Sequence, residues 1–477
     1  MDEVSKKEAA VTASIQERAD WLCTLSDAIW DRPELAFREY FAAETLTSAL
    51  EQEGFAVERG LAGIPTAFSG RFGSGSPVIA ILGEYDALAG MSQQADAAEQ
   101  IPIVPGGSGH GCGHHLLGVG ALGAAIAMKD FLQARKLPGT VLYIGCPAEE
   151  GGSGKAFLVR GSAFAEVDCA LTWHPGSFHS ALPRGSLANR QILYTFHGIS
   201  AHAASYPERG RSALDALTLM NTGVQFLREH VPATTRIHYA VTDTGGTAPN
   251  VVQSTAAAVY LIRTPSVDTL PELTERVNKV ARGAAMMTET EVTISVQKGC
   301  ANMIPNPTLC EVLRQNLEQI PKPVYSQAAL DYARRMRQTI PTATAGLMRL
   351  RAFGPEYAAF AEAHMDDPIY NVAFPEAPVP ITSETSTDVG DVSWVCPTAK
   401  VQICCVCAGT AGHTWQRTAQ GKSELAHKGM LYAAKVLSGA GIDLLTRPEL
   451  VAKAKADWTA QLQGRVYRPL PPEIQPW

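Results

Sequence analysis

Hydrophobic and polar positions along this chain of 477 residues follow two different periods. Near the N-terminus, apolar residues recur every three to four positions over 14–30 and 42–55, which predicts two helices separated by a break at 31–33. A longer apolar segment over 116–137 predicts a buried helix. Four short, continuous apolar runs end in acids, histidines or glycines. They lie within 77–88, 139–154, 167–175 and 399–415. Such runs, alternating with helices, indicate an α/β fold whose mostly parallel sheet carries helices on both faces.

The interval 188–302 has a different pattern of hydrophobic residues, which predicts segments in the order β-α-β-β-α-β. The predicted strands cover 190–198, 235–243, 255–264 and 291–299, and the predicted helices cover 210–231 and 270–289. This order is the ferredoxin-like arrangement, which folds as a small two-layer α+β unit. The sequence therefore predicts an α/β domain in two parts, 1–187 and 303–477, with an inserted domain over 188–302. The Pro- and Ala-rich stretch 322–380 lacks periodicity and is interpreted as an insertion that forms a wall of the substrate pocket.

Composition and charge exclude several classes of protein. Hydrophobic residues make up 46% and charged residues 18%, as in a globular protein with a large core. The net charge is −7 without a long basic run, which argues against nucleic acid as a partner. We expect no membrane partner, because we find no apolar run of bilayer length, and the first 20 residues lack the apolar core of a signal peptide. A cytoplasmic location is the resulting expectation.

The ten cysteines are too sparse for a secreted disulfide scaffold, so we expect reduced thiols. Cys404, Cys405 and Cys407 lie inside an apolar run, and small core residues of a strand are their simplest interpretation.

Reactive side chains gather where the apolar runs end. Residues 109–115 read GHGCGHH and place Cys112 and His114 directly before a predicted helix. In open α/β sheets, ligands bind beyond the carboxyl ends of the strands, so residues that follow different strands meet at one edge. The residues that follow the other runs are Glu84 and Asp86, Glu149 and Glu150, His174, and His413.

This set of residue types fits a pair of divalent metal ions. Thiolate and imidazole suit zinc, and carboxylates extend the range to manganese or cobalt. Five ligands hold two ions when one ligand bridges them, which leaves positions for water. Of the adjacent acids Glu149 and Glu150, one binds metal while the other takes the proton from the bridging water. Taken one at a time, these residues have simpler interpretations. Cys112 could be a small buried residue, and His174 and His413 could be loop residues. Their convergence favours the metal site.

Eight motifs together resemble the M20 metallopeptidase family, in its amidohydrolase branch, over nearly the whole chain and in the family's order. The motifs are GEYDALAG, GHGCGHHLLG, CPAEEGGSGK, TWHP, GISAHAASYPERGRSALDA, GGTAPNVVQ, STDVGDVSW and GTAGHTW. The resemblance implies a di-metal catalytic domain with an inserted lid domain that also mediates dimerisation. It implies Glu149 as the general base and Cys112 as the bridging ligand. The implied metal ligands are Cys112, His114, Glu150, His174 and His413.

The resemblance also assigns roles in the lid. His202 resembles a histidine that reaches a neighbouring subunit's site and stabilises the oxyanion. Asn250 resembles a residue that helps hold the substrate, although a turn-forming role after Pro249 is equally open. Arg263 ends a lid strand and is a candidate for binding a substrate carboxylate, with simple surface solvation as the alternative.

One departure from the family concerns the metal ligands. Many relatives carry a His-x-Asp motif that supplies a ligand, whereas this chain has Glu84, Tyr85 and Asp86 there. We expect Asp86 to orient a metal ligand without binding the metal itself. His110 and His115 are expected to support the site or the fold.

The function implied is hydrolysis of an N-acyl amino acid, such as p-aminobenzoyl-glutamate, by a metal-bound hydroxide. Two divalent ions, zinc or manganese, with cobalt as a further option, would serve as cofactors. The alternatives are a dipeptidase for β-alanyl or ω-aminoacyl dipeptides, a non-catalytic metal-binding subunit of the same fold, and a metal-storage protein. The partner would be a second copy, paired through the lid domain, or a related subunit in a heterodimer.

Overall fold

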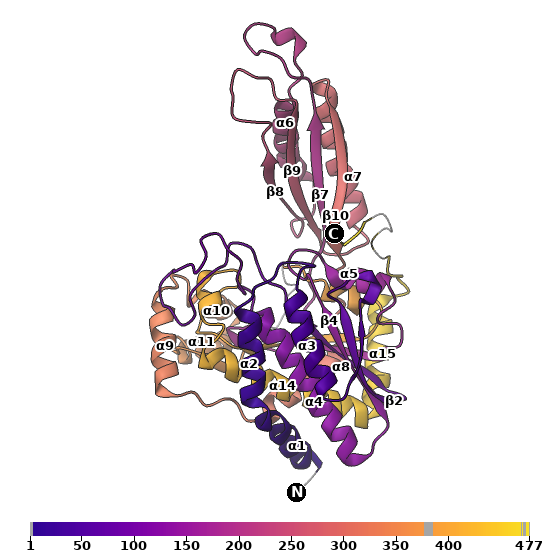
Figure 1. The fold of residues 1–477 in the computed structure, drawn as a ribbon, viewed down its shortest axis with the longest axis vertical. Coiled ribbons are helices and arrows are strands. Elements are labelled where there is room, and N and C mark those ends of the chain that lie inside the picture. The colour runs from indigo at the N-terminus through magenta and orange to yellow at the C-terminus, as the bar shows by residue number, and fades with distance from the viewer. Residues whose placement is uncertain (1–2, 376–384, 469, 471–473, 477) are drawn as a thin grey trace.

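A six-stranded sheet forms the centre of the larger domain (Figure 1). The structure, a computed structural model, describes residues 3–375, 385–468, 470 and 474–476. The strand order is β1-β2-β4-β3-β5-β12; β4, β3, β5 and β12 run parallel, and β1 and β2 join as antiparallel neighbours at one edge. The mostly parallel sheet predicted from the apolar runs is therefore confirmed. The strands are β1 Ala56–Arg59, β2 Phe68–Ser74, β3 Val78–Glu84, β4 Gly139–Cys146, β5 Cys169–Gly176 and β12 Thr398–Cys404.

Both faces of this sheet are buried, which explains why its strands are continuously apolar. Ile79 and Ile81 of β3 join the core that α4 and α14 cover, whereas Ala80 and Leu82 join a second core with α5 on the opposite face. The helices before the lid are α1 Glu3–Glu17, α2 Ala19–Trp30, α3 Tyr40–Gln52, α4 His114–Arg135 and α5 Gly154–Arg160. Those after it, apart from the 322–380 region, are α8 Pro307–Gln319, α12 Val389–Ser393, α13 Trp415–Ala419, α14 Glu424–Thr446 and α15 Pro448–Leu462. The helix predicted over 14–30 is interrupted at Arg18, between α1 and α2.

Helix α4 is the buried helix that the sequence predicts over 116–137, and it begins at His114. By length and composition it is also the one helix in the described part of the chain that could cross a membrane. This corrects the expectation that no apolar segment is long enough to span a bilayer. Most of its surface is buried against the sheet and the neighbouring helices, as in the core helix of a globular domain.

The inserted domain contains β7 Ala188–His197, α6 Ala213–Leu227, β8 Arg236–Asp243, β9 Thr255–Thr264, α7 Leu270–Met287 and β10 Glu291–Cys300. Its antiparallel sheet has the order β10-β7-β9-β8, which confirms the ferredoxin-like prediction. This domain, called the lid below, projects away from the central sheet (Figure 1). Domain boundaries at 188 and 302 stay predictions.

The lid has a base at the central domain and a tip far from it. Because Ala188 pairs with Thr264 and His197 pairs with Thr255, the start of β7 and the end of β9 lie together at the base. The loops 198–212 and 244–254 follow β7 and precede β9, so they lie at the tip. A strand rises about 3.3 Å per residue, which makes β7 roughly 30 Å long.

The region 322–380 is more regular than its sequence indicates. It contains α9 Gln327–Gln338, α10 Ala345–Leu350, α11 Pro355–Ala363 and β11 Tyr370–Ala373, and β11 pairs with the two-residue strand β6 Phe178–His179. None of its described residues lines the large cavity at the candidate site, so the interpretation as a pocket wall is wrong for this part. Residues 376–380 lie outside the described part of the chain.

Candidate metal centre

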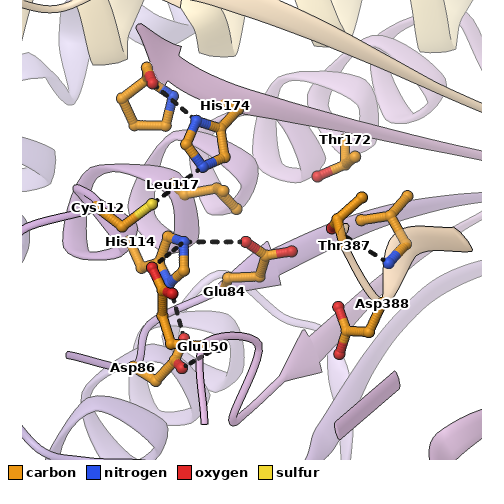
Figure 2. A network of polar contacts seen from close by, with 12 residues as sticks. Glu84, Asp86, Cys112, His114, Leu117, Glu150, Thr172, His174, Thr387 and Asp388 are labelled. Carbon is orange, nitrogen blue, oxygen red and sulfur yellow. Dashed lines mark hydrogen bonds and ion pairs between the residues drawn. The ribbon is translucent and has the colours of Figure 1, made fainter. Parts of the chain in front are cut away.

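The loop GHGCGHH turns sharply into α4 and presents two candidate ligands. Gly113 has φ 86°, a left-handed conformation that costs glycine little, and α4 begins directly after it at His114. The Nδ1 of His114 lies 2.7 Å from Asp86 Oδ1. This contact fixes the ring, because Asp86 also accepts a hydrogen bond of 2.9 Å from the backbone N–H of Glu150. The His114 Nε2 is buried and makes no hydrogen bond among the described residues, although it lies 3.4 Å from Glu84 Oε2 and 4.0 Å from Glu150 Oε1 (Figure 2).

Cys112 and His174 meet beside that nitrogen. The Sγ of Cys112 lies 3.3 Å from His174 Nε2, and the His174 Nδ1 donates to the Pro175 carbonyl over 2.7 Å (Figure 2). Arg417 donates to the carbonyls of both Cys112 and Pro175, at 3.2 and 2.5 Å, and so ties the two loops together. Burial lowers the pKa of His174 well below its usual range. The neutral imidazole that results is the form that binds a metal.

Glu150 and His413 form the other side of the cluster. Their Oε1 and Nε2 atoms lie 3.0 Å apart. His413 has φ 58°, and its backbone N–H donates to the Gly111 carbonyl, which binds this loop to the cysteine loop. Hydrogen bonds to Cys112 and Glu150 raise the pKa of His413 to about 10. Burial acts to raise the pKa of Glu150, but the His413 hydrogen bond and the His114 charge outweigh it, so the net shift is downward.

The candidate ligands form two groups of three that share Cys112. The ligand atoms of Cys112, His114 and His174 lie within 4.8 Å of one another, and so do those of Cys112, Glu150 and His413. A thiolate common to both groups, three imidazoles and a carboxylate form a donor set that suits two zinc-like ions. The residues therefore fit the pair of metal ions that the sequence predicts.

Glu149 lies beside this cluster, close to other acids. Its carboxylate, that of Glu84 and a ring nitrogen of His114 lie within 4.8 Å of one another. Burial raises the pKa of Glu149 to about 8, and the charges of Glu84 and Asp388 act in the same direction. A carboxylate with a raised pKa, next to candidate ligands, is suited to accept and return a proton.

Sequence reasoning missed Lys155, which holds the surrounding acids. Its fully buried ammonium lies 2.5 Å from Glu84 Oε1 and 2.7 Å from Asp388 Oδ1. The backbone N–H of Lys155 also donates to Asp388 over 2.9 Å. Because Glu84 already binds an ammonium, it is a poor ligand for a further cation. The motifs CPAEEGGSGK and STDVGDVSW contain Lys155 and Asp388, but nothing in their spacing shows that the two residues meet.

A cavity of about 760 Å³ opens next to the candidate metal ligands. Arg263, near the base of the lid, lines it, as do Cys112, Glu149, Glu150, His174 and His413. His202 and Asn250 do not line it. Both lie in tip loops, away from the cavity, and His202 bridges to Val251. The backbone N–H groups of Ala204 and Ser205 donate to His202 Nδ1, at 3.2 and 3.1 Å, which leaves its Nε2 as the outward-facing donor.

The remaining histidines and cysteines of the sequence prediction support the fold. His110 and His115 are buried, and their Nε2 atoms lie 3.1 and 2.9 Å from the carbonyls of Ile29 and Gly421. All ten cysteines are free thiols. Cys404, Cys405 and Cys407 are buried in the core at and after β12.

Comparison with known proteins identifies the family of this chain. The model of peptidase family M20/M25/M40 matches residues 80–378. The chain belongs to this family. It is 44% identical to a subunit of the p-aminobenzoyl-glutamate hydrolase of Escherichia coli (strain K12), covering 98% of this chain and 97% of that one. It is 30% identical to the Xaa-Arg dipeptidase of Mus musculus, covering 97% and 94%.

Two solved structures show the same M20 fold. An aminobenzoyl-glutamate utilization protein from Klebsiella pneumoniae has a TM-score of 0.62 at 16% identity and covers 92% of this chain and 99% of its own. A dinuclear metal-binding M20 peptidase from Bacillus subtilis has a TM-score of 0.57 at 16% identity, covering 91% and 99%. With the family match and the full-length hydrolase relatives, they confirm the M20 fold and show that this protein is a hydrolase.

Proposed function

We propose that this M20 hydrolase uses two divalent ions to cleave the amide bond of an N-acyl amino acid such as p-aminobenzoyl-glutamate. The observation that carries the proposal is the pair of ligand groups that share Cys112, with the half-buried Glu149 beside them. Cys112, His114 and His174 would hold one ion, and Cys112, Glu150 and His413 the other. When bound, the ions would acidify a water molecule and polarise the substrate carbonyl.

Glu149 would perform the proton transfers. It would take a proton from the attacking water onto its carboxylate and return it to the nitrogen of the leaving amine. Asp86 would keep His114 in the orientation that points Nε2 at the site. His202 would act at the site of a second copy or related chain, because the tip loop that carries it lies roughly 30 Å from the base of its own lid. Its Nε2–H would donate to the developing oxyanion.

The substrate assignment rests on the charge of the cavity. Four basic side chains and the three carboxylates of Glu149, Glu150 and Asp388 line it, and the excess of basic groups favours an acidic substrate. The basic side chains are Arg184, Arg263, Lys298 and Lys400. p-Aminobenzoyl-glutamate carries two carboxylates, and the Escherichia coli relative is named for its hydrolysis. A dipeptidase is the second candidate, since two relatives are named Xaa-Arg dipeptidase, but a basic cavity disfavours an arginine side chain.

The proposed partner follows from the name of the Escherichia coli relative. The Escherichia coli relative is named as one subunit of its hydrolase, which supports assembly with a related chain, while a second copy paired through the lid is the alternative. Light scattering on the purified chain, alone and mixed with a related chain, separates the two assemblies.

A substrate screen tests the function. The purified protein is stripped of metal and loaded separately with Zn²⁺, Mn²⁺ and Co²⁺, and bound metal is measured by mass spectrometry. We expect about two ions per chain and release of p-aminobenzoate from p-aminobenzoyl-glutamate. Faster cleavage of β-alanyl dipeptides would favour the dipeptidase. Two bound ions without turnover on either panel would favour a non-catalytic role.

A further inference from the structure

One basic side chain in the cavity stands apart from the others. Lys298 donates to the Glu150 carbonyl over 2.9 Å, and Arg263 interacts with other groups of the chain. Lys400 lies near His174 and helps lower the pKa of that ring. The Nε atoms of Arg184 and Arg263 are both buried without a hydrogen-bond partner among the described residues, but Arg263 has a further interaction with the chain. Burial lowers the pKa of Arg184 without a carboxylate to oppose the shift.

The segment that carries Arg184 is fixed at both ends. Residues 180–187 connect β6 to β7. At its start, Ser180 exchanges two backbone hydrogen bonds with Gln402, at 2.9 and 2.7 Å. At its end, the Leu187 N–H donates to the Thr385 carbonyl over 3.0 Å, and the Ser186 hydroxyl accepts from the Met303 N–H over 3.0 Å. Arg184 therefore stands on an anchored loop and is held at the cavity wall.

Two further residues that line this cavity each have a polar side-chain atom that is buried without a hydrogen-bond partner among the described residues. These atoms are the Asn189 Oδ1 and the Ser386 Oγ. The Asn189 Nδ2 donates to Cys300 Sγ over 3.1 Å, which leaves Oδ1 as the acceptor. Arg184 as a whole is half-buried, but burying its Nε without a partner is costly in a folded protein, as it is for each of the other unpaired polar atoms. These atoms belong to residues that line one cavity, where the polar groups of a ligand can satisfy them.

We propose that Arg184 binds a carboxylate of the amino-acid half of the substrate, with the Ser386 hydroxyl as a second donor. A guanidinium offers planar, paired N–H groups that match a carboxylate, which a lysine ammonium does not. Asn189 Oδ1 accepts a ligand N–H beside them. The proposal rests on the proposed function for its substrate class. It makes Arg184 the residue that selects acyl amino acids with a free carboxylate over their neutral analogues.

The test compares p-aminobenzoyl-glutamate with its α-amide and its γ-amide, each of which lacks one carboxylate. The variants are Arg184→Gln and Arg184→Lys in the full-length, metal-loaded protein. For Arg184→Gln, we expect kcat/KM for p-aminobenzoyl-glutamate to fall by roughly 10- to 100-fold, mainly through KM. For the amide that lacks the recognised carboxylate, we expect a change below about threefold, and Arg184→Lys should fall between these values.

Arg190→Gln is the matched control. Asn189 and Gln191 line the cavity, and successive side chains of a strand point to opposite faces, so Arg190 on β7 points away from it. Its variant should keep wild-type kinetics on all three compounds. Equal losses on all three compounds for Arg184→Gln, or the same selective loss for Arg190→Gln, would overturn the proposal.

Binding constants keep this test separate from the proposed function. Calorimetry with the same three compounds measures the affinity of wild type and Arg184→Gln whether or not the amide bond is cleaved. A wild type that binds p-aminobenzoyl-glutamate without cleaving it contradicts the proposed function, while a selective loss of affinity in Arg184→Gln still supports the carboxylate subsite. A wild type that binds the diacid and both amides equally overturns the subsite.

Discussion

The floor of the cavity and the tip of the lid differ in how their polar residues are held. At the floor, Asp86, His114 and Glu150 are linked by hydrogen bonds and charge, and Lys155 binds the acids behind them. At the tip, the backbone N–H groups of Ala204 and Ser205 hold His202 Nδ1, and the His202 Nε2 faces outward. The floor is thus held by contacts within one chain. At the tip, no described residue accepts a hydrogen bond from the His202 Nε2.

This difference separates two parts of the proposed chemistry. Metal binding and proton transfer need groups that stay in place before the substrate arrives, and a packed floor provides them. Stabilisation of the oxyanion by His202 needs the tip to meet another chain. Variants of the floor should therefore change metal binding, stability or chemistry in each chain independently, and variants of the tip should depend on the assembly.

The largest expected effect is at Glu149. Glu149→Gln keeps the shape of the side chain but cannot accept a proton, so kcat should fall by about 10³-fold or more. The metal content should stay at the wild-type value, because Glu149 is not a proposed ligand. Steady-state kinetics on p-aminobenzoyl-glutamate and metal analysis of the same sample provide the measurement.

The neighbouring acid gives the contrast for that experiment. Glu150→Gln alters a proposed ligand and should lower both the metal content and the activity. If Glu149→Gln loses metal to the same extent as Glu150→Gln, the division of roles between the two acids is wrong.

The next effect is on the stability of the floor. Lys155→Met removes a buried ammonium and leaves Glu84 and Asp388 without their shared cation. Breaking a buried ionic cluster in this way costs about 3–5 kcal/mol of unfolding free energy. Urea unfolding followed by tryptophan fluorescence measures the change. Lys428→Met breaks a more exposed pair with Glu424 and should cost less than about 1 kcal/mol. Equal stabilities of the two variants would show that the charge cluster does not hold the floor.

A smaller effect, of another kind, is expected at the tip. His202→Ala should lower kcat by roughly 10²-fold with little change in KM, because its donor acts on the oxyanion. His197→Ala, an exposed lid histidine that contacts Thr293, should keep wild-type kinetics.

For the proposed pairing of two copies, mixing variants of low activity tests whether His202 acts on the site of the other copy. His202→Ala and Glu149→Gln chains are co-refolded in equal amounts. Half of the dimers should be hybrids with one complete site of two, so activity should return to about a quarter of wild type. No recovery in a verified hybrid would show that His202 does not act on the partner's site.

The sequence predicted those elements of the fold whose buried residues form a regular pattern over a short stretch of chain. Continuous apolar runs predicted the parallel strands, and the strand-end rule placed Cys112, His174 and His413 at one sheet edge, where the structure brings them together. The alternation of β-α-β-β-α-β predicted the lid for the same reason. These patterns depend only on neighbouring residues, so they survive without any knowledge of the tertiary contacts.

Contacts between distant segments could not be predicted in this way. Lys155 and Asp388 are 233 positions apart, and their pairing depends on how α5 packs against the segment before α12. Arg184 lies in an irregular loop whose direction is set by hydrogen bonds to 303, 385 and 402. Glu84 was visible as a departure from the family motif, but its partner Lys155 was not. The charge balance around the candidate metal ligands is therefore a property of the fold and not of any single motif.

The smallest expected effect concerns Asp86, which contacts the candidate ligand His114 and is not itself a proposed metal ligand. Asp86→Asn keeps one acceptor for His114 or for the Glu150 N–H but loses the charge that holds the imidazole. Removing such a supporting carboxylate typically weakens metal affinity by about 10- to 100-fold. Competition with a chromophoric chelator measures this affinity, and activity should recover when excess Zn²⁺ or Mn²⁺ is supplied. Recovery by metal would separate Asp86 from Glu149, whose loss no metal concentration repairs. An Asp86→Asn variant with wild-type affinity would mean that packing alone orients His114, and the rigidity of the floor would then owe little to its charges.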